Sequence, residues 1–122
     1  MMTMMPTKPK YRQGDVVLVL FPNSNLRTAK RRPALIIQAD NLQTGLSQVI
    51  VAMITSNMSR ANHPSRVSVK HSSSEGHQSG LLSDSVVMTD NLATITELGI
   101  QRVIGQLPLA NVKSALRYTF GL

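Results

Sequence analysis

The sequence predicts a mainly β protein, a small, curled, mostly antiparallel barrel followed by one C-terminal helix. Six short segments are rich in apolar and β-branched residues and are separated by turn residues. Only the last part of the chain repeats its apolar residues at helical spacing. The length of 122 residues suits one domain, and no internal repeat is visible. Five or six strands with short turns are typical of a small barrel.

The first three strands are predicted from runs of apolar residues. "DVVLVLF" (15–21) is almost continuously apolar after Gly14, which is typical of a strand buried on both faces. "PALIIQ" (33–38) and "SQVIVAMIT" (47–55) follow, and the turn-like "DNLQTGL" separates them. We expect Pro33 at the first position of its strand, where the missing N–H costs no ladder bond.

The remaining strands are shorter. "SRVSVK" (65–70) alternates apolar and polar residues, as a half-exposed strand does, and "SDSVVMTD" (83–90) and "RVIGQL" (102–107) complete the set. The polar, Gly/Ser-rich "HSSSEGHQSG" (71–80) predicts a mobile loop. The segment 22–32 is also predicted to be a loop, and it carries four of the thirteen cations.

The C-terminal helix is predicted from apolar residues at helical spacing, with proline in the first turn and glycine near the end. Leu107 stands where a capping Ser, Thr or Asp would be better, so the start is weak. We expect this helix to pack across the sheet through its apolar residues: Leu109, Val112, Leu116 and Phe120.

Composition excludes several classes of protein. There is no cysteine, which excludes disulfides, thiolate zinc sites and cysteine nucleophiles. No apolar run reaches the roughly 18 residues of a membrane span, and the start lacks the apolar stretch of a signal peptide. We therefore expect a cytoplasmic protein with no membrane contact, in which residues 1–12 form a flexible basic arm and residues 13–122 form the single domain.

The positive charge is concentrated in the first part of the chain. The net charge is +7; residues 1–70 hold ten Lys or Arg against two Asp, whereas residues 71–122 hold three cations against four acids. A basic half beside a near-neutral half favours a surface that faces a polyanion.

Familiar catalytic and cofactor motifs are missing. The three histidines occur without HxxxH or HExxH spacing or an acidic cluster, so we expect no metal site. No GxSxG, GxGxxG or GxxxxGK[ST] motif occurs, and we expect no cofactor.

One arginine and one hydroxyl remain as candidates. Arg32 precedes proline, which pushes its backbone towards extended geometry, and a fixed guanidinium can bind phosphate through two parallel hydrogen bonds. A structural ion pair with Asp15 or Asp84 is the alternative. Thr55 ends an apolar strand and could donate to a phosphate oxygen, or it could simply begin a loop.

The order of these segments resembles one known family. "GDVVLVLFP", a basic loop, "RRPALIIQ", "VIVAMITSN", "GLLSDSVVMTDNLATI" and "ALRYTFGL" follow one another as in the MazF/PemK family, from about Tyr11 to Leu122. Members of this family are the endoribonuclease toxins of type II toxin–antitoxin systems. The resemblance implies an SH3-like, plasmid-toxin (CcdB-like) barrel that acts as a homodimer and cleaves single-stranded mRNA at specific sequences without a metal.

The resemblance also assigns site residues. The arginine before proline in the family's motif falls on Arg32 and the threonine that ends the third strand on Thr55, which makes these two the catalytic candidates. The family's RNA-binding positions and its flap over the RNA correspond to further residues: Arg27, Lys30, Arg31, Ser56 and Asn57. It implies attack by the 2′-OH, with 2′,3′-cyclic phosphate and 5′-OH ends, and a cognate antitoxin whose acidic, disordered segment covers the site. "DNLATI" (90–95) departs from the family's "DQ(L/I)RTI" and could alter RNA contacts or the dimer surface.

Three questions stay open at this point. The general base is unassigned; His63 is one candidate because histidine is the usual acid–base side chain near neutral pH, and an ordinary loop histidine is the alternative. A toxin of the same fold could inhibit a protein target such as DNA gyrase, for which the terminal helix offers only two aromatic residues. The chain could also be a barrel that binds RNA without cutting it.

Overall fold

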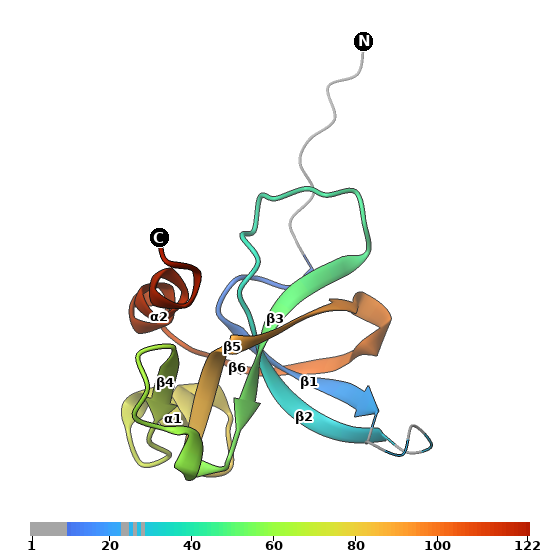
Figure 1. Cartoon of the computed structure of the whole chain (residues 1–122). Helices are drawn as coiled ribbons and strands as arrows, with labels where there is room; N and C mark the ends of the chain where they lie inside the picture. The colour runs from blue at the N-terminus through green and yellow to red at the C-terminus, as the bar shows by residue number, and fades with distance from the viewer. Residues whose placement is uncertain (1–9, 23–24, 26, 28) are drawn as a thin grey trace.

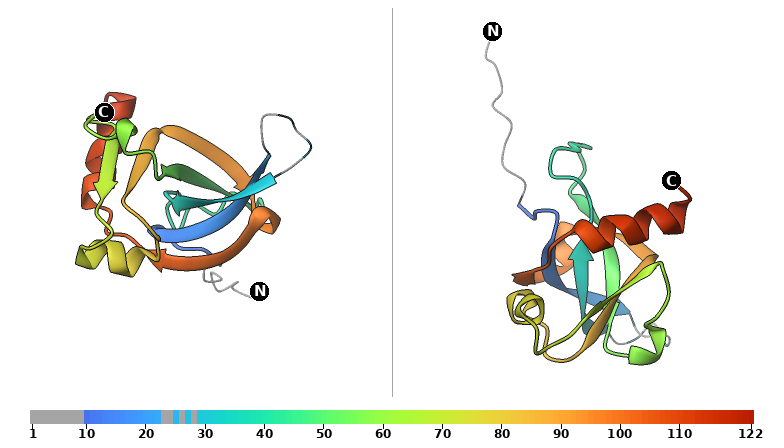
Figure 2. Two further views of the ribbon diagram at one scale, coloured as in Figure 1. Left: turned by 90° about the horizontal axis from the view of Figure 1, so that it is seen from below. Right: turned by 90° about the vertical axis from the view of Figure 1, so that its left-hand side faces the viewer.

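The fold is built on one antiparallel sheet, seen in a computed structural model that describes residues 10–22, 25, 27 and 29–122. Its strands lie in the order β4-β5-β3-β2-β1-β6. Their bounds are β1 Asp15–Pro22, β2 Ala29–Ile36, β3 Gln48–Thr55, β4 Arg66–Val69, β5 Ser85–Thr96 and β6 Ile100–Gln106. The sheet curls strongly (Figures 1 and 2), but no pairing between β4 and β6 closes it within the described residues. The predicted mainly β, antiparallel architecture is confirmed, with an open sheet.

The described residues also form two helices and two 3-10 turns: α1 Ser74–Ser79, α2 Ala110–Phe120, η1 Met58–Arg60 and η2 Glu97–Gly99. The helix α2 packs against β4 and β5, while α1 packs against β6 (Figure 1). The predicted C-terminal helix is confirmed, and Gly121 ends it in the left-handed region at φ 70°. Its start has no side-chain cap, since Leu109 occupies that position. Val112 is buried as expected, whereas Phe120 is 58% exposed, so its assignment to the packed face was wrong.

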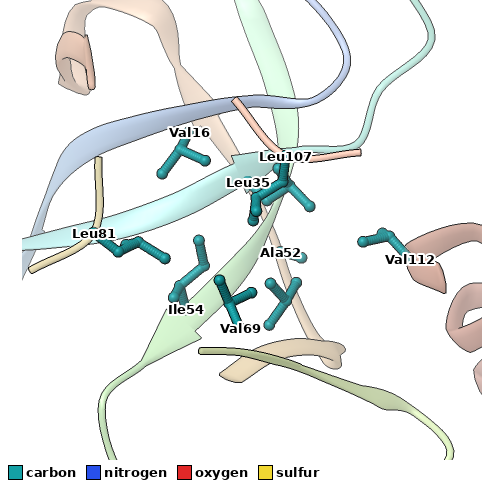
Figure 3. Close-up of a cluster of buried hydrophobic side chains, with 9 residues drawn as sticks. Val16, Leu35, Ala52, Ile54, Val69, Leu81, Leu107 and Val112 are labelled. Carbon is teal, nitrogen blue, oxygen red and sulfur yellow. The ribbon is translucent and has the colours of Figure 1, made fainter. Parts of the chain in front are cut away.

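The core has two parts because strand side chains alternate between the faces of the sheet. Val16 belongs to a first cluster on one face, and Val17 and Val19 belong to a second cluster on the other. All three are at most 1% exposed, which confirms that β1 is buried on both faces. The first cluster (Figure 3) also holds Leu81, from the segment after α1, and Val112 of α2.

The strand β2 begins four residues earlier than the sequence predicts. Its ladder with β1 runs from Pro22↔Ala29 to Val16↔Leu35, so Lys30, Arg31 and Arg32 lie in the strand and not in the preceding loop. Pro33 is therefore the fifth residue of β2, not the first. The ladder between β2 and β3 begins only at Ala34, so Pro33 lies just beyond its end, where proline is tolerated.

The strand β5 is also longer than predicted, and it is irregular. Its register with β3 jumps from Ala52↔Leu92 to Met53↔Met88, which leaves residues 89–91 without a partner on β3. Extra residues of this kind bend a strand and increase its twist, which helps the sheet to curl.

The segment 71–80 is a short helix and not the predicted loop. The Ser73 side chain accepts a hydrogen bond from the Gly76 N–H at 3.0 Å and so caps α1, and Gly80 ends the helix at φ 72°. Serine and glycine favour helix caps as well as loops, which is why the composition of this segment was misleading.

The predicted arm, residues 1–12, lies largely outside the described residues, since residues 1–9 are not described. Tyr11 packs against the second cluster. The domain boundary at residue 13 stays a prediction.

Candidate active site

A pocket of about 590 Å³ opens beside the C-terminal end of β3, between β2, β6 and the segment that follows α1. Among the described residues, four of those that line it are cations and none is Asp or Glu. Three of these cations are consecutive residues of β2, and β6 adds Arg102 from a distant part of the sequence. The lining is Leu18, Lys30, Arg31, Arg32, Pro33, Ile54, Thr55, Ser56, Gly80, Leu81, Leu82, Ser83, Ser85, Arg102 and Ile104.

The two candidate catalytic residues both line this pocket. The last pair between β2 and β3 is Ala34↔Met53, and counting two residues further puts Arg32 opposite Thr55, where no pairing is recorded. The β2–β3 pairing thus ends before Pro33, and both residues line the pocket beyond its end.

The guanidinium of Arg32 and the O–H of Thr55 are both available to bind a ligand. The Arg32 side chain is exposed and makes no ion pair or hydrogen bond with any other described residue, so the structural pairing with Asp15 or Asp84 does not occur. The Thr55 Oγ1 accepts a hydrogen bond from the Asn57 N–H at 3.1 Å. A hydroxyl that accepts in this way still has its O–H to donate, and the described part of the chain offers it no acceptor.

Arg32 also borders a second, smaller pocket. It pairs with Val19 and so shares the face of Ala34, whereas Arg31 shares the opposite face with Pro33. A recess of about 240 Å³ on that side is lined by Arg32, Met53, Asn91 and Ala93. Asn91 and Ala93 are the two positions at which "DNLATI" departs from the family's motif, so this departure lies next to the arginine.

The predicted RNA-binding residues divide into two groups. Lys30, Arg31 and Ser56 line the large pocket. Asn57 does not; its Oδ1 caps η1 and accepts hydrogen bonds from the Ser59 N–H at 3.1 Å and from the Ser59 Oγ at 2.7 Å. Arg27 is exposed and lies outside the pocket lining, and residues 23, 24, 26 and 28 of the predicted flap lie outside the described residues.

Comparison with known proteins agrees with this arrangement. The sequence model of the PemK-like, MazF-like toxins of type II toxin–antitoxin systems matches residues 12–119. The chain belongs to this family. The resemblance predicted from the sequence is thereby confirmed.

This MazF-like chain has named relatives in mycobacteria. It is 34% identical over 90 residues to "Endoribonuclease MazF6" of Mycobacterium tuberculosis (strain H37Rv) and, to the same extent, to "Endoribonuclease MazF2" of Mycobacterium bovis; the match covers 73% of this chain and 75% of each relative. The solved structure of Mycobacterium tuberculosis toxin MazF-mt6 superposes with a TM-score of 0.68 at 26% identity and covers 88% of this chain and 97% of that one. A MazE–MazF structure from Deinococcus radiodurans shares the fold at 17% identity, with a TM-score of 0.68 and coverage of 92% and 96%.

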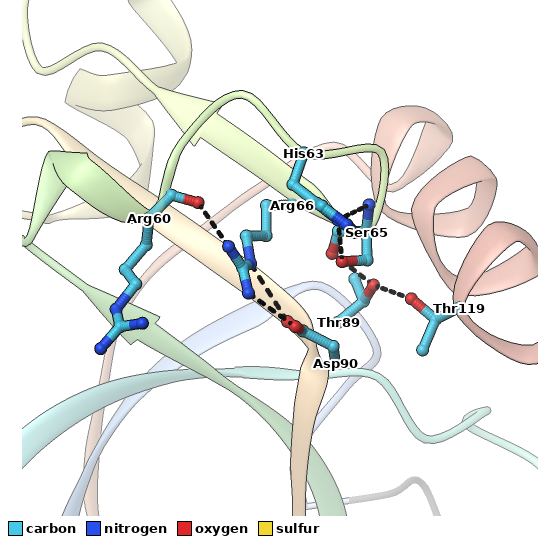
Figure 4. A network of polar contacts seen from close by, with 7 residues as sticks. All are labelled: Arg60, His63, Ser65, Arg66, Thr89, Asp90 and Thr119. Atoms are coloured by element: carbon cyan, nitrogen blue, oxygen red, sulfur yellow. Dashed lines mark hydrogen bonds and ion pairs between the residues drawn. The ribbon is translucent and has the colours of Figure 1, made fainter.

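His63 of the MazF-like chain does not line the pocket. Its Nδ1 lies 2.6 Å from the Ser65 Oγ (Figure 4). Its ring meets that of Tyr118 in α2 edge-on, at a centroid distance of 6.0 Å. The Thr89 Oγ1 donates a hydrogen bond to the Ser65 carbonyl oxygen at 2.6 Å. It also lies 2.7 Å from the Thr119 Oγ1, a contact in which either hydroxyl can be the donor. These contacts link α2 to β5 and to the segment just before β4, and they hold His63 outside the pocket lining.

An ion pair lies beside these contacts. The Arg66 guanidinium donates to Asp90 at 2.8 Å, and it also donates to the Arg60 carbonyl at 3.1 Å (Figure 4). The hydrogen bond from Arg66 lowers the pKa of Asp90 below its ordinary value. Asp90 belongs to the unpaired residues of β5, so this ion pair holds the irregular part of the strand against β4.

This ion pair predicts acid sensitivity. A carboxyl whose pKa is lower in the folded chain contributes stability that is present above its unfolded pKa, near about 3.9, and is lost as the pH falls through the folded pKa. We expect Asp90→Asn to lower the urea midpoint at pH 7 and the difference from the parent protein to vanish at low pH. Asp40→Asn is the matched control, since the Arg12–Asp40 pair is exposed and spans 3.8 Å. If Asp90→Asn lowered the urea midpoint by the same amount at pH 7 and at about pH 2 to 3, below the ordinary pKa of Asp, this assignment would be contradicted.

The sequence did not point to Arg102, which also lines the pocket. It lies in β6, opposite Leu18, and a single cation in a strand pattern carries no signal by itself. Only the topology reveals it, because β6 pairs with β1 and so reaches the same pocket as β2.

No group of three His, Cys, Asp or Glu that could hold a metal ion occurs in the part of the chain that the structure describes. No described helix has the length and apolar character to span a membrane.

Proposed function

We propose that this chain is a sequence-specific endoribonuclease toxin that cleaves single-stranded mRNA without a metal ion. The observation that carries the proposal is that one pocket is lined by the unpaired guanidinium of Arg32 and by the Thr55 hydroxyl, whose O–H is still available to donate, with no acidic residue in the described lining. The names of the mycobacterial relatives support it, since both are endoribonucleases.

The cleavage step needs only groups of this kind. The 2′-oxygen of the ribose attacks the adjacent phosphorus, the bond from phosphorus to the 5′-oxygen breaks, and the products are a 2′,3′-cyclic phosphate and a 5′-OH. Negative charge grows on the nonbridging oxygens in the transition state. Arg32 binds these oxygens, and the Thr55 hydroxyl donates to one of them; preorganised donors of this kind lower the barrier most where charge develops.

Cleavage moves two protons, one to the leaving 5′-oxygen and one from the attacking 2′-OH. The 5′-oxygen takes a proton from Arg32 or from water as it leaves. The pocket lining contains no His, Asp or Glu, so water accepts the proton of the 2′-OH. Arginine stays protonated at neutral pH and is a poor base, which fits a role in charge stabilisation.

The other residues of the pocket supply binding. Lys30 and Arg31 contact RNA phosphates, Ser56 contacts the nucleotide near Thr55, and Arg27 and Asn57 act from outside the lining. The same positive surface suits a cognate antitoxin with an acidic, disordered segment that covers the site. One mycobacterial endoribonuclease of this fold has been solved in complex with its cognate antitoxin. We further propose a homodimer that acts in the cytoplasm; light scattering of the purified protein tests the dimer.

The decisive experiment uses a long RNA of mixed sequence. The purified protein is incubated with the RNA in excess EDTA, and the 5′-OH ends are sequenced. We expect cuts at a recurring short sequence, and we expect DNA of the same sequence to stay intact because it has no 2′-OH. RNA that is bound but not cut would indicate the non-catalytic barrel instead.

One observation favours a second candidate. Tyr118 and Phe120 of α2 are 60% and 58% exposed, and exposed aromatic residues are frequent anchors of protein interfaces. Inhibition of DNA gyrase in a supercoiling assay, without any cleavage of RNA, would support a toxin that acts on a protein target.

A further inference from the structure

The wall of the large pocket opposite Thr55 has its own unpaired cation. Leu18 of β1 pairs with Pro33 on one side and with Arg102 on the other, so all three project on one face of the sheet. The Arg102 side chain is exposed and forms no ion pair or hydrogen bond with the rest of the described chain. Two strand spacings, about 10 Å, separate the backbones of Pro33 and Arg102.

Arg102 and Arg32 approach the pocket from different sides. Arg32 shares the face of Ala34, whereas Arg102 shares the face of Leu18. Their backbones lie two strand spacings apart and their side chains leave opposite faces of the sheet, which favours contacts with two different phosphates. The position of Arg102 therefore suits a different anionic group of the same ligand.

Apolar surface lies next to this cation. The segment after α1 brings Leu81 and Leu82 to the pocket, with Leu81 buried in the first cluster and Leu82 94% exposed. Close backbone packing fixes the segment: a Cβ added to Gly80 would lie 2.1 Å from the Ile104 carbonyl oxygen. A cation beside exposed apolar side chains matches a nucleotide, which joins a charged phosphate to a flat base that packs on apolar or planar groups.

We propose that this wall is a second nucleotide subsite, in which Arg102 binds a phosphate beside the scissile one and Leu18 and Leu82 contact the attached base. The proposal rests on the proposed function, because it places a neighbouring nucleotide of the same RNA. Since the contact is to a phosphate, Arg102 strengthens the binding of all sequences equally.

Binding at several salt concentrations tests this subsite. The probe is a mixed-sequence RNA of about twelve nucleotides in which every 2′-OH is methylated, so that the protein cannot cut it. Its affinity is measured by fluorescence anisotropy between about 50 and 300 mM KCl. We expect Arg102→Ala to reduce the slope of log K against log salt by about 0.7, the value for one phosphate of a single strand, and to weaken binding about fivefold at 0.1 M salt.

Two further variants control the measurement. Lys113→Ala removes an exposed cation of α2 that is not in the pocket lining, so we expect its slope to equal that of the parent protein. Arg102→Lys keeps the charge and should restore the slope. The proposal would be overturned if Arg102→Ala had the same slope as the parent protein. It would also be overturned if Lys113→Ala reduced the slope as much as Arg102→Ala does.

The alternative ligand is an acidic peptide. If Arg102→Ala weakened binding of a Glu- and Leu-rich peptide but left RNA binding unchanged, the subsite would belong to a protein partner and the nucleotide assignment would be wrong. Failure of this inference is separate from failure of the proposed function. A parent protein that cuts RNA while Arg102→Ala binds RNA normally refutes only the subsite, whereas a parent protein that never cuts RNA refutes the function.

Discussion

Arg32→Ala is expected to abolish RNA cleavage and to leave the fold unchanged. Removing one preorganised donor that binds the developing charge typically lowers kcat by about 100- to 1000-fold. A guanidinium can offer more than one N–H to a phosphate, so we expect the loss to lie at or beyond the upper end of this range. The measurement is the rate of cleavage of a labelled RNA that the parent protein cuts, at saturating RNA concentration.

The fold should tolerate this change because Arg32 is exposed and has no partner in the described chain. An unchanged melting temperature therefore separates lost chemistry from lost structure. Arg32→Lys keeps the charge but not the planar fork, so it should bind RNA almost as well as the parent protein and still cleave poorly. Arg31→Ala is the neighbouring control; it should weaken RNA binding with little effect on kcat. Full activity of Arg32→Ala would remove this residue from the mechanism.

The sequence predicted the strands well where the pattern of apolar residues alone decides them. The strand β1 is buried on both faces, as its nearly continuous apolar run predicted. The end of α2 was also predicted correctly, because Gly121 has a local role that needs no tertiary contact.

Elements that depend on distant parts of the chain were missed. The start of β2 is set by its ladder with β1, so "KRR" forms a strand despite its charge. The helix α1 is capped by Ser73 and stabilised by close packing on β6, and neither can be told from a serine-rich loop by composition.

The site was predicted unevenly for the same reason. From the residues alone, Arg32 could equally form a structural ion pair and Thr55 could simply begin a loop. The family resemblance selected them as the catalytic candidates. Their place in one pocket follows from the register of β2 and β3, which no local pattern contains. Arg102 could not be found at all before the order of the strands was known.

Gly105→Ala is expected to be strongly destabilising, because Gly105 lies where β6 packs on α1 behind the site. A Cβ at Gly105 would lie 2.3 Å from the Gln78 carbonyl oxygen and from the Ser79 carbonyl carbon, which are backbone atoms of α1. Real Cβ atoms do not approach other atoms so closely, so α1 and β6 would have to separate. Overpacking of this kind costs about 1–3 kcal/mol even where side chains can move, and here the obstacle is backbone.

Separation of α1 from β6 would also disturb the pocket, because the segment after α1 supplies Leu81 to the core and Leu82 to the pocket. We therefore expect Gly105→Ala to lower the melting temperature by about 10 °C or more and to weaken RNA binding together with stability. Gly99→Ala is the matched control just before β6: its nearest new contact would be the Thr96 Oγ1 at 3.8 Å, an ordinary distance, so its melting temperature should stay close to that of the parent protein. If Gly105→Ala had the same melting temperature as Gly99→Ala, the close contact between α1 and β6 would not exist in solution, and the pocket wall built on it would be misplaced.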